Sequence, residues 1–265
     1  AARAFFGRAP ASRRMRADEP HPQARALLDE LDGADVEPLH ELSPERARER
    51  AAAMRSGGGP AVGAVEDRTL DCPGGDLPVR IYRPEGDGPA PTVVHFHGGG
   101  FVVGDLDGSE GFCRHLCVAA DAVVASVDYR LAPEHPFPAA VEDAVAATEW
   151  AADAQDELGG ADRGLAVAGD SAGGTLAAVA ALVARDRDGP DIDHQALVYP
   201  VTSASDDWAS YRENGEGYFL ERESMTWFEG HYFDSELHRR NPYAFPLNAC
   251  DLSDLPPATV LTAGF

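Results

Sequence analysis

From residue 79 onward, short apolar segments bounded by glycine or proline alternate with helical stretches. This alternation predicts an α/β fold, in which a mostly parallel central sheet has helices on both faces. The predicted strands are residues 79–82, 92–96, 123–127, 165–168, 195–199 and 259–262. The predicted helices are residues 109–119, 137–155 and 172–186.

Two regions depart from this alternation. Residues 21–57 predict two helices, and the second begins after Ser43, because Ser43-Pro44-Glu45 supplies a capping residue, a first-turn proline and an early acid. Residues 203–240 are polar and rich in aromatic residues, and they separate two apolar strands by more residues than a simple crossover needs. We interpret this stretch as an insertion that forms a lid with the N-terminal helices.

These observations predict a division of the chain. Residues 1–60 form an N-terminal segment with cap helices, 61–202 and 241–265 form the α/β domain, and 203–240 form the cap insertion. Residues 1–14 precede Met15 and are interpreted either as an upstream extension or as a non-native remnant of cloning.

A serine follows the strand at 165–168. Gly169, Asp170, Ser171, Ala172 and Gly173 spell G-x-S-x-G and lead into a helix of small residues. A nucleophilic serine must project from a tight, strained turn between a strand and a helix, and glycines on both sides leave room for that approach. The pattern therefore indicates a nucleophile, although a five-residue match alone is weak.

Three consecutive glycines follow the strand at 92–96. His97, Gly98, Gly99 and Gly100 allow the backbone to bend so that amide N–H groups point into a cavity and bind an oxyanion. Taken alone, the motif would also fit a flexible turn. Both glycine-rich turns follow parallel strands, however, so we expect both at the carboxyl edge of the sheet, where such sheets bind ligands.

Together these motifs resemble the hormone-sensitive-lipase-like branch of the α/β-hydrolases, microbial carboxylesterases with an HGGG motif. The resemblance covers nearly the whole chain. It rests on HFHGGGFVVGD at 95–105, VDYRLAPEHPFPAAVED at 127–143, GDSAGG at 169–174, ENGEGYFL at 213–220 and DLPPATVLTAGF at 254–265. It implies the α/β-hydrolase fold with a helical cap.

The resemblance also implies roles for individual residues. Ser171 would be the nucleophile that becomes acylated. The backbone amides of Gly99, Gly100 and Ala172 would bind the oxyanion, His97 would brace the glycine loop and Gly98 would let it turn. Asp170 and Glu134 would be structural supports, with Gly169 and Gly173 completing the motif. The implied partner is a small-molecule ester, with no metal and no cofactor.

The catalytic acid and histidine are the point where the match breaks. In α/β-hydrolases they follow the serine in that order, and the resemblance places the acid just after the strand at 259–262. This chain ends at Phe265, so we expect the acid, the histidine, the last strand and the last helix to belong to a longer polypeptide. This chain alone is expected to bind esters and to turn them over very slowly. A relocated pair of Asp234 with His231 or His238 is the weaker alternative.

The expected activity is hydrolysis of short to medium acyl esters through a serine acyl-enzyme. One alternative is a non-catalytic small-molecule-binding protein on the same fold. Another is amide or lactone hydrolysis, because those reactions pass through a similar tetrahedral oxyanion.

The charge narrows the class of partner. The chain has 22 basic residues, all arginine, against 45 acidic ones, for a net charge of −23. Such a surface repels nucleic-acid phosphates and anionic lipids. A bias toward G and C codons would explain arginine without lysine, whereas adaptation to high salt also explains the excess of acids, because molar salt shortens the screening length to about 3 Å. A haloarchaeal, salt-adapted member is therefore our interpretation.

The remaining composition points to a cytoplasmic protein. No apolar run approaches the roughly 18 residues of a membrane-spanning helix, and no secretion signal is recognisable. Cys113 and Cys117 flank His115, but no second Cys/His pair completes a metal site, so we expect buried helical thiols in a reducing compartment. The sequence does not fix the oligomeric state, so both a monomer and a homo-oligomer are compatible with it.

Overall fold

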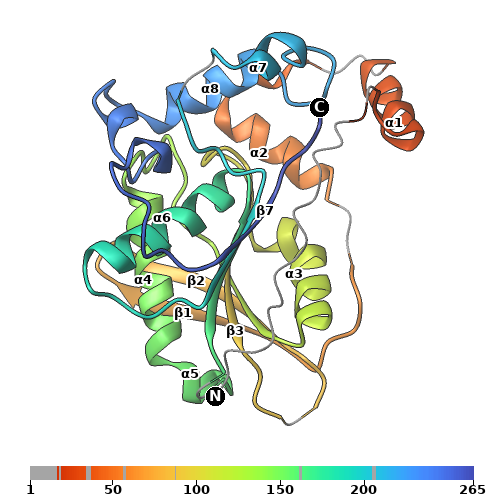
Figure 1. Ribbon diagram of the computed structural model, residues 1–265. Helices are drawn as coiled ribbons and strands as arrows, with labels where there is room; N and C mark the ends of the chain where they lie inside the picture. The colour runs from red at the N-terminus through yellow and green to blue at the C-terminus, as the bar shows by residue number, and fades with distance from the viewer. Residues whose placement is uncertain are drawn as a thin grey trace.

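The computed structural model describes residues 17, 19–33, 37–55, 58–86, 88–160, 163–204 and 207–265. The predicted extension at residues 1–14 lies outside this range. The described part consists of a twisted central sheet flanked by helices, with a group of helices above one end of the sheet (Figure 1).

The described residues contain a seven-stranded sheet in the order β1-β2-β4-β3-β5-β6-β7. Its strands are β1 (Ala64–Cys72), β2 (Gly75–Arg83), β3 (Thr92–Phe96), β4 (Val123–Val127), β5 (Leu165–Asp170), β6 (His194–Val198) and β7 (Ala258–Leu261). β1 and β2 form an antiparallel hairpin, β2 pairs antiparallel with β4, and the other pairs are parallel. The prediction of a mostly parallel sheet is confirmed.

The central strands are continuous apolar runs because both of their faces are covered. Every residue of β3 and β4 is buried. The prediction matched both strands in full, and it placed the other predicted strands within a few residues. It did not anticipate β1, whose side chains are mostly exposed. An edge strand with both faces largely in water carries no apolar periodicity to detect.

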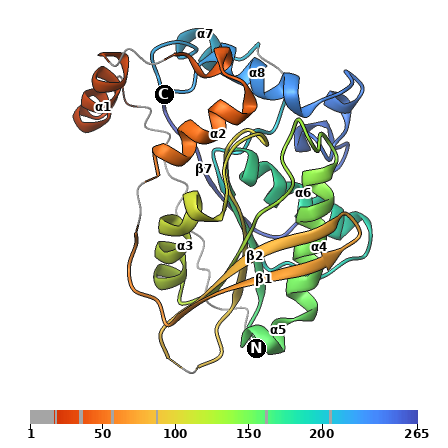
Figure 2. The ribbon, with the colours of Figure 1, turned by 180° about the vertical axis from the view of Figure 1, so that it is seen from behind.

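Helices cover both faces of the sheet (Figures 1 and 2). α3 (Leu106–Ala120) packs on β2 and β4, whereas α4 (Ala139–Asp153) and α6 (Ala172–Asp186) pack on each other and on β3 and β5 from the opposite side. The short α5 (Gln155–Leu158) follows α4. Cys113 and Cys117 lie buried in α3 as free thiols, as expected.

The remaining helices gather beyond the carboxyl ends of the parallel strands. They are α1 (Pro22–Gly33), η1 (Leu39–Glu41), α2 (Pro44–Ala53), α7 (Ala209–Glu213), α8 (Arg222–Tyr232), η2 (His238–Arg240) and η3 (Pro246–Asn248). The predicted start of α2 is confirmed, because Ser43 Oγ accepts a hydrogen bond from the N–H of Arg46 at 3.4 Å. No described helix is both long enough and apolar enough to cross a bilayer.

Two contacts join this group of helices together and to the sheet edge. The indole N–H of Trp227 in α8 donates to the carbonyl of Leu42, just before α2, at 3.2 Å. Arg48 in α2 donates to the carbonyls of Val102 and Ala132 at 2.8 Å each. Segments from both ends of the chain are therefore held over the same loops, an arrangement that suits a cap.

Candidate active site

Ser171 occupies the junction between β5 and α6. Its backbone has φ 52° and ψ −118°, which is unusual for a residue other than glycine and costs about 1–3 kcal/mol. The turn is held on both sides, since the N–H of Ser171 donates to the carbonyl of Val198 in β6 at 2.9 Å and its carbonyl accepts from the N–H of Thr175 at 3.0 Å. The serine is thus displayed on a rigid turn, as the sequence motif predicted.

The glycines of the motif are required by close backbone packing. A Cβ on Gly169 would lie 2.7 Å from the carbonyl oxygen of Phe96, and a Cβ on Gly173 would overlap the same carbonyl. Any larger residue would push α6 away from β3. The predicted supporting role of Gly169 and Gly173 therefore has a direct steric basis.

The triple-glycine turn lies beside the serine turn because β3 and β5 are neighbours. Phe96 is paired with Gly169 in the sheet register, so the residues that follow each strand emerge side by side. The N–H of Gly98 donates to Oδ1 of Asp170 at 3.0 Å, which joins the two turns directly. Gly99 and Gly100 have φ values of 127° and 58°, conformations that favour glycine.

His97 supports the turn from beneath. Its ring is buried and stacks on Tyr129 at 4.4 Å between centroids, and its Nδ1 lies 2.8 Å from the carbonyl of Gly98. Burial lowers the pKa of His97, which favours the neutral ring. Since a carbonyl only accepts, Nδ1 carries the proton and donates it to Gly98. These contacts fix His97 against the glycine turn, and its bracing role stays a prediction.

A second buried histidine, which the sequence analysis did not single out, lies behind Asp170. Nε2 of His95 is 3.9 Å from Oδ1 of Asp170, and burial lowers the pKa of His95 to about 3. On its other side, Nδ1 lies 3.3 Å from the Cys113 thiol. Burial also raises the pKa of Asp170, although the hydrogen bond from Gly98 acts in the opposite direction. The hydrogen bond from the N–H of Gly98 holds the Asp170 carboxylate, and the neutral ring of His95 lies behind it.

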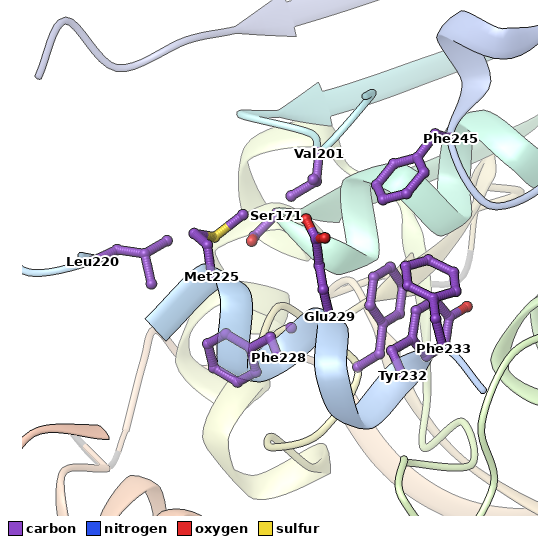
Figure 3. Close-up of a pocket in the computed structure, with 11 residues that line it drawn as sticks. Ser171, Val201, Leu220, Met225, Phe228, Glu229, Tyr232, Phe233 and Phe245 are labelled. Carbon is purple, nitrogen blue, oxygen red and sulfur yellow. The ribbon is translucent and has the colours of Figure 1, made fainter. Parts of the chain in front are cut away.

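A pocket opens at this edge of the sheet (Figure 3). Ser171 and Gly100 both line it, so the two predicted turns share one pocket. The cavity is lined by Gly100, Phe101, Ser171, Val201, Leu220, Met225, Phe228, Glu229, Tyr232, Phe233 and Phe245. Its wall is mostly apolar and aromatic, which is typical of a small-molecule site.

Of the three predicted oxyanion donors, Gly100 is among the residues that line the pocket, and Gly99 and Ala172 are not. Gly99 is partly exposed, and Ala172 is buried at the first position of α6. Within the described residues, the backbone N–H of none of the three donates a hydrogen bond to another backbone or side-chain group. Unpaired N–H groups at a helix start and a glycine turn are available to a ligand oxygen.

One face of α8 forms the opposite wall. Met225, Phe228, Glu229 and Tyr232 follow the spacing of three and four residues that places side chains on the same side of a helix. The sequence analysis assigns the aromatic-rich residues 203–240 to the lid but does not single out Glu229. The helical spacing was a signal, but a glutamate on that face would ordinarily be assigned to solvent.

The alternative pair of histidine and aspartate receives no support from the cavity. His231 packs edge-on against Trp227 at 4.5 Å, and His238 lies 5.3 Å from the Phe137 ring. Neither residue lines the cavity that holds Ser171, and nor does Asp234. A search of the described residues finds no group of three or more His, Cys, Asp or Glu side chains arranged to hold a metal.

Comparison with known proteins agrees with this geometry. Residues 93–265 match a family model described as alpha/beta hydrolase fold. Esterase LipI of Mycobacterium tuberculosis is 49% identical over 76% of this chain, which spans 64% of that relative. An ethyl acetate hydrolase of Pseudomonas putida is 37% identical, with 86% of this chain and 74% of the relative covered. A solved esterase structure from Pyrobaculum calidifontis superposes with a TM-score of 0.82 at 41% identity, covering 91% of this chain and 78% of the other.

Proposed function

Because the chain belongs to the hormone-sensitive-lipase-like α/β-hydrolases, we propose that it hydrolyses carboxylic esters with Ser171 as the nucleophile. The observation that carries the proposal is the shared pocket. Ser171 and Gly100 line one cavity, and Asp170 joins their two turns through the N–H of Gly98.

The geometry accounts for the acyl-transfer half of the reaction. Ser171 Oγ adds to the ester carbonyl, and the carbonyl oxygen becomes an oxyanion that the N–H groups of Gly99, Gly100 and Ala172 stabilise. A single donor of this kind is worth about 3 kcal/mol in the transition state. Collapse expels the alcohol and leaves Ser171 acylated, and water then releases the acid. A base must take the serine proton and return it to the alcohol, and in this fold that base is a histidine placed after the serine and the acid in chain order.

The cavity favours short to medium acyl groups. Aromatic and aliphatic side chains close its wall, which limits the room for a long acyl chain. The similarity to a protein named for ethyl acetate hydrolysis supports a small ester. Free, buried thiols at Cys113 and Cys117 fit a reducing compartment, so we propose the cytoplasm as its location.

The proposal is tested by hydrolysis of p-nitrophenyl butyrate in molar KCl. The assay compares this chain with the polypeptide as its gene encodes it, each with and without Ser171→Ala. We expect hydrolysis of the ester, and we expect the Ser171→Ala substitution to abolish it. Activity that survives Ser171→Ala would refute the mechanism. Ester binding without turnover by either polypeptide would favour the non-catalytic alternative.

We also propose that the protein is adapted to high salt. Its net charge is −23 with no lysine. Among the described residues, some arginines each bridge two carboxylates. Arg80, for example, bridges Asp67 at 2.6 Å and Asp107 at 2.9 Å. Repulsion among the remaining acids is weakened when salt screens them.

A further inference from the structure

Glu229 supplies a charged group to the lining of the candidate active site. The other ten lining residues are glycines, aliphatic or aromatic side chains, or Ser171 itself. Figure 3 shows the Glu229 side chain extending from α8 with its carboxylate on the side of Ser171. Only 18% of this side chain is exposed. Burying a carboxylate in apolar surroundings costs free energy unless a charged or hydrogen-bonding partner compensates for it.

One partner of Glu229 is Arg239, which is not among the residues that line the pocket. Nη1 of Arg239 is 2.5 Å from Oε2 of Glu229, and the guanidinium also lies over the Phe233 ring at 5.7 Å. The ion pair offsets the cost of burying the carboxylate. Because the carboxylate lines the cavity and the guanidinium does not, the cavity is exposed to the negative end of the pair.

The aromatic residues around Glu229 strengthen the same preference. Phe101 and Tyr232 stack on each other at 3.9 Å between centroids, so these two rings contribute apolar surface and not open faces. Phe228, Phe233 and Phe245 also line the pocket. Aromatic rings around a site attract cations, and quaternary ammonium groups are bound in this way by other proteins.

We propose that this cavity selects esters that carry a cationic ammonium group, and that Glu229 is the residue that recognises that group. This inference rests on the proposed function for the chemistry at Ser171, but not for the binding preference itself. Glu229 here is a specificity-determining residue that contacts the substrate's charged end. Esters bearing a carboxylate at the same position are disfavoured, because the like charges repel.

The test compares two esters of nearly equal shape, butyrylcholine and its uncharged analogue 3,3-dimethylbutyl butyrate. Binding is measured by calorimetry in the Ser171→Ala background at one fixed KCl concentration, so that turnover does not enter. With Glu229 intact, we expect the choline ester to bind at least about tenfold more tightly than the neutral ester, on the order expected for a partly screened charge contact. Glu229→Gln should reduce this ratio to about twofold or less.

Glu223→Gln is the matched control. Glu223 lies on the same helix and is exposed, so its substitution removes the same charge without touching the cavity. Its ratio should stay that of the parent. An equal affinity for the two esters, or a ratio that Glu229→Gln and Glu223→Gln change alike, overturns the inference. If Glu229→Gln does not fold, the KCl dependence of the parent's ratio decides, and a ratio that does not fall as KCl rises overturns it.

The experiment distinguishes failure of this inference from failure of the proposed function. Absence of turnover of both esters by the polypeptides that retain Ser171 would count against the esterase proposal and leave the binding ratio as measured. If instead Glu229→Gln abolishes kcat for charged and neutral esters alike, with the ratio of affinities unchanged, Glu229 belongs to the chemistry and the specificity role is wrong.

Discussion

Gly100→Ala is the substitution whose cost can be worked out most directly from this structure. Gly100 has φ +58°, a left-handed conformation that costs an L-residue about 1–2 kcal/mol. A Cβ there would also overlap the ring of Phe228, which is buried in α8. Forcing a methyl group into a packed site adds about 1–3 kcal/mol. The smaller entropy of the unfolded alanine chain returns about 0.4–1 kcal/mol. We therefore expect Gly100→Ala to lower the free energy of unfolding by about 2–4 kcal/mol.

Gly217→Ala separates the two causes. Gly217 has φ +75°, and a Cβ there would meet nothing within 4 Å. This control shares the backbone strain but not the clash, so it should cost about 1 kcal/mol. Urea unfolding of the parent and both variants in the same KCl buffer gives the comparison. Equal destabilisation by the two substitutions would refute the reasoning, because the clash between a Cβ at residue 100 and α8 would then add nothing to the loss of stability.

Three further predictions concern charge. Burial raises the pKa of Asp128 from 3.8 to about 6, so the native state loses stability as pH rises through this interval. The free energy of unfolding of Asp128→Asn, measured in urea titrations, should therefore rise by about 1–2 kcal/mol relative to the parent between about pH 4 and pH 7. A difference that stays constant over this range would contradict this prediction. Hydrogen bonds from Arg48 lower the pKa of Glu134 to about 2, so this pair stabilises the native state above pH 4.5 and the contribution is lost as pH falls toward 2. Arg48→Met should remove that acid dependence and speed amide exchange in α2, whereas Arg46→Met, which breaks an exposed pair with Glu37, should do neither. If the melting temperature in about 0.1 M KCl equals that in about 3 M KCl, salt adaptation is wrong.

The central part of the fold could be predicted because its physical causes are local. β3, β4 and α6 have buried apolar runs or small residues bounded by glycine and proline, and the structure places all three where the pattern did. β1 was not predicted because its side chains are mostly exposed and show no alternation of apolar and polar residues. The pairing of β3 with β5 follows from the order of strands in the sheet, which no local pattern in either strand specifies.

The residues of the candidate site also divide into those that the sequence predicts and those that it does not. Ser171 and the triple-glycine turn could be predicted because each needs a particular residue type for steric reasons that the sequence displays. Glu229 could not, because its position depends on how α8 is rotated about its axis, and that rotation is fixed by long-range contacts such as the one between Trp227 and Leu42. A glutamate among aromatic residues on a helix is compatible with either a solvent face or a cavity wall until that contact is known.

This division has a functional consequence. The geometry that we propose for catalysis belongs to the sheet, since the register of β3 against β5 and the hydrogen bond from Gly98 to Asp170 hold the two turns side by side. The cavity wall that a substrate meets belongs to α8, which reaches the sheet edge through side-chain contacts such as that of Phe228 with the glycine turn. Substitutions on the inner face of α8 should therefore change which esters bind while the turn at Ser171 keeps its backbone conformation. The same sheet edge can serve different substrates as the residues on this one helix vary.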